Sequence, residues 1–126
     1  MALARELALI ESPSNRPETQ GPVFDRLAEV MAEAGLRTRR LEGRVSGGQL
    51  YAAPARPRPP GAQLIIGHVD TVWPVGTLAD MPVELRDGKL HGPGVYDMKA
   101  GLVLALHAGA RNLLAAIFNV PRQINI

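Results

Sequence analysis

The sequence predicts an α/β fold with a largely parallel sheet, and three observations favour it. Strand-like and helix-like segments alternate along the 126 residues, an order that is typical of helices layered on a sheet. Leu64-Ile65-Ile66 is a continuous β-prone apolar run, as expected for a strand buried on both faces. The segment that begins at Met98 is almost entirely apolar, which is typical of a buried helix.

The N-terminal half is expected to contain two helices and two strands. Apolar residues of Leu3–Ile10 form one helical stripe, and the turn-forming segment Ser12–Pro17 ends it. Apolar positions recur at helical spacing from Val23 to Ala34, with a glycine just beyond as a natural stop. Two short strands separated by a glycine-rich turn are then expected, at Leu36–Leu41 and Gln49–Ala53.

The C-terminal half is expected to hold a hairpin and a long helix. A proline-rich connector over residues 54–61 leads into it. Val83–Arg86 and Lys89–His91 flank Asp87-Gly88, a pair that suits the positive φ angles of a tight turn. Met98–Phe118 is expected to form one helix, which Pro121 would end.

Composition limits the classes of function. With 46% hydrophobic and 21% charged residues, the chain has the composition of a globular domain. Cysteine is absent, so a metal has to be held by histidine and carboxylate. The net charge of +2 is small and aromatic residues are few, which disfavours a nucleic-acid partner.

A membrane partner is not expected either. No apolar run reaches the roughly 18 to 20 residues that a membrane-spanning helix needs. The apolar N-terminal run contains Arg5 and Glu6 and lacks a small-residue cleavage site, unlike a signal peptide. These features predict a cytoplasmic protein.

The first candidate site follows the predicted strand at Leu64–Ile66. His68 and Asp70 are two residues apart and point to the same side if the strand continues. Ligands in open α/β sheets usually bind at this C-terminal end of the strands. A histidine that binds a metal commonly donates its other ring proton to a carboxylate, a role for which Asp70 is well placed. Taken alone, a histidine near a strand end is more often structural than a metal ligand, so His68 by itself does not establish a metal site.

The second candidate is Asp97, which follows two glycines and precedes the predicted buried helix. A carboxylate there can cap the helix by accepting a backbone N–H bond. It can also bridge two metal ions about 3.5 to 4 Å apart, as two-metal hydrolases require. The residue type alone does not choose between these roles.

The two segments in this order carry a family resemblance. His68–Val72 followed by Gly92–Gly101 closely resembles the two N-terminal signatures of the aminoacylase, acetylornithine deacetylase and glutamate carboxypeptidase superfamily of zinc hydrolases. Glu11–Ser14 also looks like a segment of that family, and Trp73–Thr77 most resembles its glutamate carboxypeptidase branch. The resemblance extends over about Leu3–Ala116 and implies the N-terminal part of a three-layer αβα domain.

The resemblance implies a role for each matched residue. His68 corresponds to a ligand of one zinc, Asp97 to the carboxylate that bridges two zincs, and Asp70 to the catalytic residue that orients His68. Met98 and Lys99 match the family pattern without an evident role. Enzymes of the family cleave an amide bond with a metal-activated water, acting as carboxypeptidases or N-acyl amino acid deacylases. A small peptide or N-acyl amino acid substrate and a homodimeric parent enzyme are therefore implied.

The chain departs from the family pattern after Asp97. In the family a general-base glutamate, a further acidic ligand, a distant histidine and a lid or dimerisation domain follow, whereas no Asp or Glu follows Asp97 here. His107 is expected to be a packing or surface histidine and His91 a hairpin residue. We therefore expect 1–126 to be a partial catalytic domain with an atypical tail at 117–126. It should be inactive alone and bind zinc weakly or not at all.

Two alternatives to a hydrolase fragment remain at this stage. One is a non-catalytic binding protein that retains the half-fold. The other is a basic nucleic-acid module, which the sparse aromatic residues disfavour.

Overall fold

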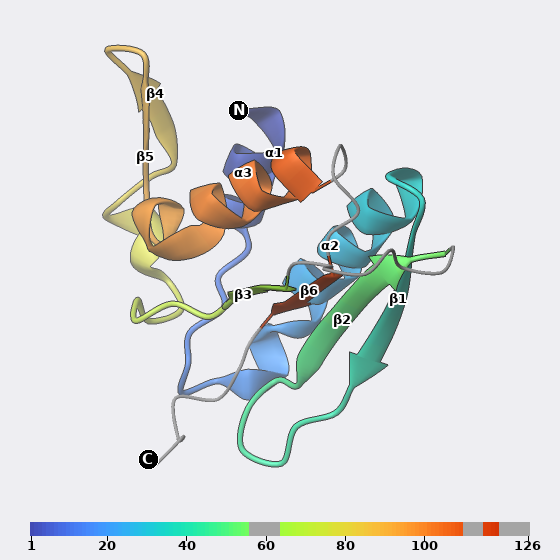
Figure 1. Ribbon diagram of the computed structural model, residues 1–126. Coiled ribbons are helices and arrows are strands. Elements are labelled where there is room, and N and C mark those ends of the chain that lie inside the picture. Colours follow the sequence, from blue (N-terminus) through green and yellow to red (C-terminus); the bar gives the residue numbers. More distant parts are fainter. Residues whose placement is uncertain (56–63, 110–114, 119–126) are drawn as a thin grey trace.

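A computed structural model describes residues 1–55, 64–109 and 115–118, the last of these by backbone only. Within these residues, three α-helices combine with a four-stranded sheet and a separate hairpin (Figure 1). The helices are α1 (Ala2–Leu9), α2 (Gly21–Glu33) and α3 (Ala100–Gly109). The sheet contains β1 (Leu36–Leu41), β2 (Gln49–Pro54), β3 (Leu64–Gly67) and β6 (Ala115–Phe118). The predicted α/β class is confirmed.

The sheet is mixed rather than largely parallel, which corrects the prediction. Its strand order is β1-β2-β6-β3. β1 and β2 pair antiparallel from Leu36 opposite Pro54 to Leu41 opposite Gln49, because a short loop joins them as a hairpin. β6 then runs antiparallel to β2 and parallel to β3.

The long helix expected over Met98–Phe118 is also wrong. α3 ends at Gly109, and Ala115–Phe118 forms β6 between β2 and β3. An apolar run of this kind suits a buried strand as well as a buried helix, and pairing with strands on both sides decides in favour of the strand. Pro121 and most of the proline-rich connector lie outside the described residues.

The other expected elements are confirmed within a few residues. α2 has a proline in its first turn and ends before Gly35, whose φ of +78° a side chain would disfavour. The hairpin consists of β4 (Glu84–Arg86) and β5 (Lys89–His91), and its turn residues Asp87 and Gly88 have φ of 51° and 72°. It projects from the body of the molecule beside α1 and α3 (Figure 1).

One core joins the three helices to the sheet. α2 contributes the largest set of fully buried side chains, Val23, Phe24, Leu27 and Met31. These belong to the same cluster as Leu7 of α1, Leu50 of β2 and Leu102 of α3. The uniformly apolar α3 is thus buried along part of its surface, although Leu104 is 72% exposed.

Among the described residues, β3 is covered on one face and not on both, contrary to the expectation from its sequence. Ile65 packs against the core cluster, whereas Leu64 and Ile66 are 53% and 55% exposed. Successive side chains of a strand point to opposite faces, so the two exposed residues share the face that turns away from the core. That face is apolar and accessible.

Candidate metal centre

His68 and Asp70 occupy the loop that begins where β3 ends at Gly67. The His68 Nδ1 lies 2.9 Å from the backbone carbonyl of Asp70 and 3.3 Å from its carboxylate Oδ1. The carbonyl is therefore the closer acceptor, with the carboxylate beside it. Both contacts favour a ring orientation that leaves Nε2 facing away from Asp70.

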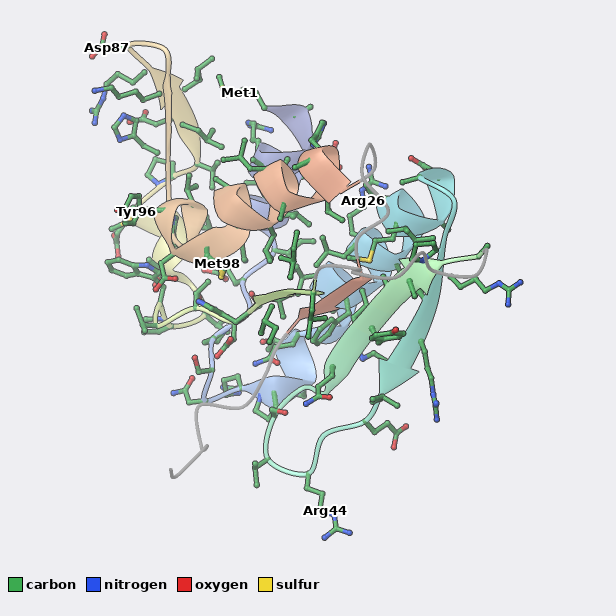
Figure 2. The ribbon with its side chains drawn as sticks, in the orientation of Figure 1. Met1, Arg26, Arg44, Asp87, Tyr96 and Met98 are labelled. Carbon is green, nitrogen blue, oxygen red and sulfur yellow. The ribbon has the colours of Figure 1, made fainter. Side chains whose placement is uncertain are left out.

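Asp97 lies in η3 (Val95–Lys99), a single wide turn that leads into α3. Its φ and ψ of −122° and 98° are not helical, and the Asp97–Met98 peptide bond is cis. Figure 2 shows Tyr96 and Met98, the two neighbours of Asp97, at this turn. Tyr96 is 99% exposed, and the Met98 sulfur lies 3.5 Å from the backbone nitrogen of His68.

His68 and Asp97 converge in the structure, as two residues of one metal site have to. The His68 Nε2 and the Asp97 Oδ1 are 2.9 Å apart, although the residues are 29 positions apart in sequence. The side chain of His68 is 31% exposed and that of Asp97 is 64% exposed, so the pair opens to solvent on one side. The carboxylate thus contacts a histidine, an arrangement that helix capping alone does not require.

The charges around His68 favour its protonated form. Hydrogen bonding to the Asp70 carboxylate, followed by the Asp70 carbonyl and Asp97, raises the pKa of His68 to about 9. In turn, hydrogen bonds from His68 and Ser14 hold the pKa of Asp70 below its ordinary value. A metal ion that binds Nε2 has to replace a proton there, so metal binding releases protons.

The donor atoms fit a metal ion with a small adjustment. Two ligands of one tetrahedral zinc, each about 2.0 to 2.2 Å from it, lie about 3.4 Å apart. The 2.9 Å between the His68 and Asp97 donor atoms has to widen by about half an ångström to reach that separation. A nitrogen and a carboxylate oxygen are donors that zinc accepts. Across the described residues, no group of three or more His, Cys, Asp or Glu side chains is arranged around one point.

Comparison with known proteins identifies the family of the chain. The sequence profile of peptidase family M20/M25/M40 matches residues 64–126, which is half of the chain and includes both His68 and Asp97. The chain belongs to this M20 family. Its matched half begins at β3, so it contains both turns that meet at the His68–Asp97 contact.

The relatives include deacylases and a carboxypeptidase. The chain is 33% identical to a succinyl-diaminopimelate desuccinylase of Caulobacter sp. strain K31 over 130 aligned positions, gaps included, and the match covers 98% of the chain and 30% of that enzyme. It is 41% identical to carboxypeptidase G2 of Pseudomonas sp. strain RS-16 over 44 residues, 35% of the chain and 11% of that enzyme. The chain therefore spans less than a third of the length of these M20 relatives.

The fold agrees with M20 structures at low sequence identity. The M20 family metallo-carboxypeptidase Sso-CP2 from Sulfolobus solfataricus superposes with a TM-score of 0.74 at 16% identity. The match covers 91% of this chain and 28% of the carboxypeptidase chain. It confirms the architecture of the described α/β unit.

The other two histidines lie apart from this contact, as expected. His107 is exposed on α3, and its Nδ1 lies 2.8 Å from the Val103 carbonyl one turn earlier. His91 lies on β5, opposite Glu84 in the hairpin. Neither residue contributes to the contact between His68 and Asp97.

Sequence reasoning noted Lys99 and the segment of Glu11 but missed the contacts that these two charged residues make next to the site. Lys99, only 1% exposed, donates from Nζ to the backbone carbonyl of Ile10. Glu11 accepts hydrogen bonds from the backbone N–H groups of Gly76 and Leu78. Both residues lie within segments that match the family pattern, and this match was the sequence signal that could have drawn attention to them. The match does not predict their hydrogen-bond partners, which are distant in the sequence.

Burial shifts the pKa of Lys99, and hydrogen bonding shifts the pKa of Glu11. Burial lowers the pKa of Lys99 to about 8, although the negative charge of Glu11 opposes this. The N–H groups of Gly76 and then Leu78 hold the pKa of Glu11 below its ordinary value.

Among the described residues, no helix is long and apolar enough to cross a membrane.

Proposed function

We propose that this chain is the metal-binding part of a zinc-dependent M20 hydrolase that cleaves an amide bond. A carboxypeptidase and an N-acyl amino acid deacylase both suit the relatives, and a small peptide or N-acyl amino acid is the proposed substrate. The 2.9 Å contact between His68 Nε2 and Asp97 Oδ1 carries the proposal. It brings an imidazole nitrogen, which can bind a metal once it has lost its proton, and a carboxylate together at an open surface.

Each residue has a proposed part in this centre. His68 binds through Nε2, and Asp70 fixes the ring by accepting from Nδ1. The side chain of Asp97 is largely exposed and has two carboxylate oxygens, which suits a residue that would bridge two ions. Zinc bound there would supply a Lewis acid that polarises the amide carbonyl and acidifies water.

We further propose that residues 1–126 are a partial catalytic domain that does not turn over substrate alone. A general base has to accept a proton from the attacking water, and no acidic residue follows Asp97 in this sequence. Two donors are also fewer than the three protein ligands typical of catalytic zinc sites. Zinc binding by the chain should consequently be weak.

Metal binding by matched histidine variants tests the proposal. Zinc and cobalt titrations of the 126-residue chain, followed by calorimetry and by the cobalt absorption bands, should show saturable binding. His68→Ala should abolish it, while His91→Ala, which removes a histidine from the hairpin, should leave it unchanged. Equal binding by the two variants would contradict the proposed centre.

Activity is a separate measurement. The chain is incubated with N-acyl amino acids and with peptides that end in glutamate, in the presence of zinc. We expect no hydrolysis above the His68→Ala background. Chelator-sensitive turnover that depends on His68 would show that the described residues suffice for catalysis.

A further inference from the structure

The two segments that carry His68 and Asp97 are both bonded to a third segment, Ile10–Ser14, which we call the bracket. It leaves α1 and passes beside the loop after β3, where Pro13 and Thr71 form an isolated parallel bridge. Ser12 is fully buried and Thr71 is 6% exposed. The attachment between Ser12 of the bracket and Thr71 is therefore shielded from solvent.

Bonds between the bracket and the His68 segment are numerous. The Ser12 hydroxyl donates to the Val69 carbonyl at 2.8 Å, and the Thr71 N–H donates to the Ser12 carbonyl at 2.9 Å. The Ser14 N–H donates to the Thr71 carbonyl at 2.9 Å. Val69 and Thr71 are the residues on either side of Asp70, so these bonds fix the backbone of the loop that presents His68.

Glu11 extends this attachment further along the same loop. Its two carboxylate oxygens each lie 2.9 Å from the Gly76 nitrogen, and one lies 3.1 Å from the Leu78 nitrogen. A charged acceptor makes stronger hydrogen bonds than a neutral one. The loop is thus held at its start by Ser12 and at its far end by Glu11.

Lys99 connects the bracket to the Asp97 segment. Its Nζ donates to the Ile10 carbonyl, and its own N–H donates to the Gly94 carbonyl at 3.0 Å, closing the turn that contains Asp97. The side chain is 1% exposed, and a charge so buried needs a specific polar partner. That partner, Ile10, is adjacent to Glu11.

We propose that the bracket sets the spacing of the two metal-ligand segments, with Glu11 and Lys99 as its positioning residues. The inference rests on the proposed metal centre but concerns residues that do not touch the metal. Metal ligands need their donor atoms placed to within about 0.2 Å. In the described part of the chain, the polar contacts between the two ligand segments are the ligand pair itself and one bond to a weak sulfur acceptor. The bracket supplies the charge-assisted bonds that such placement needs.

Amide hydrogen exchange in the full chain tests the connection without any metal. In Lys99→Met the amides of Thr71, Gly76 and Leu78, none of which Lys99 contacts through a hydrogen bond, should exchange about tenfold faster relative to amides of α2. Lys89→Met, which alters an exposed lysine of β5, is the matched control. Acceleration confined to residues near Ile10 would overturn the proposal.

Glu11→Gln tests the bracket from its other end and covers the case in which Lys99→Met does not fold. The glutamine keeps the shape of the side chain and loses the charge. We expect faster exchange of the Lys99 amide, which Glu11 does not contact, and no such change in Glu29→Gln on α2. An unchanged Lys99 amide in a folded Glu11→Gln chain would contradict the coupling.

Zinc affinity, measured by competition with a chromogenic chelator, completes the test. Both bracket variants should bind zinc at least about tenfold more weakly than the parent chain, whereas the control variants Lys89→Met and Glu29→Gln should bind it as the parent does. Unchanged affinity in both would overturn the positioning role while leaving the proposed centre intact. Absence of zinc binding by the parent chain would instead refute the proposed function, and the exchange data would still decide whether the bracket couples the two segments.

Discussion

Gly94 is the residue at which a single added methyl group should disturb the metal centre most. It precedes η3 with a φ of +68°. A Cβ at this position would lie 2.4 Å from the Thr71 Cγ2, far inside normal contact. Since Thr71 bonds to the bracket and Gly94 begins the turn that contains Asp97, the Gly94→Ala change pushes the two ligand segments apart.

The magnitude follows from comparison with Gly88. Gly88 lies in the β4–β5 turn with a φ of +72°, and a Cβ there meets nothing within 4 Å. Gly88→Ala should therefore lower the free energy of unfolding by about 1 to 2 kcal/mol, the cost of the left-handed conformation alone. Gly94→Ala should lower the free energy of unfolding by a similar amount and by about 1 to 3 kcal/mol more, because the added methyl group overpacks the site.

Removing the Thr71 methyl group that the added Cβ would strike provides the decisive control. Thr71→Ser deletes Cγ2 and keeps the hydroxyl, at a cost of about 1 kcal/mol for one buried methyl group. When Thr71→Ser is combined with Gly94→Ala, it should instead raise the free energy of unfolding by about 1 kcal/mol or more relative to Gly94→Ala alone, because the overlap disappears. Urea unfolding of dilute protein, followed by circular dichroism, measures all four variants. Equal losses at Gly88 and Gly94, or strictly additive losses in the double variant, would refute the steric reasoning.

Three further outcomes are expected. Hydrogen bonding holds the pKa of Glu11 in the folded chain below 4.5, so the stability that its carboxylate contributes is present above pH 4.5 and is lost as the pH falls through the folded value. The difference in free energy of unfolding between the parent chain and Glu11→Gln should therefore shrink over that range in acid unfolding curves. Ile66→Thr and Leu104→Lys, at exposed apolar positions, should reduce concentration-dependent association in sedimentation velocity without lowering thermal stability. Arg40→Leu should cost about 1 kcal/mol in urea unfolding because the guanidinium lies 3.8 Å from the ring centre of buried Phe24; no loss would contradict a cation–π contribution.

The sequence was informative where the local signal and the tertiary outcome agree. Helical spacing with a terminal glycine predicted α2, and Asp87-Gly88 predicted the hairpin, because each depends on residues close in the chain. The approach of His68 to Asp97 was predictable because both sit where the family pattern places its ligands. Their metal-binding roles remain predictions.

Three features depended on partners far along the chain and were not predictable. Ala115–Phe118 became a strand because β2 and β3 offer unpaired edges on either side of it, which no local pattern reveals. Leu64–Ile66 looked doubly buried because its composition does not report whether a second layer covers it. The bracket stayed hidden because Glu11 meets its partners more than 60 positions away.

The metal centre and the exposed sheet face make different demands on the chain. The contacts that hold His68, Asp70 and Asp97 come from the bracket, the loop after β3 and the η3 turn, all of which the structure describes. The outer face of β3, with Leu64 and Ile66, instead lacks cover in the described part of the chain. We therefore expect association through that face and zinc binding at the proposed centre to be independent of each other. Ile66→Thr should reduce association and leave zinc binding unchanged. This separation allows the proposed metal centre to be studied in a chain that spans less than a third of the length of these M20 relatives.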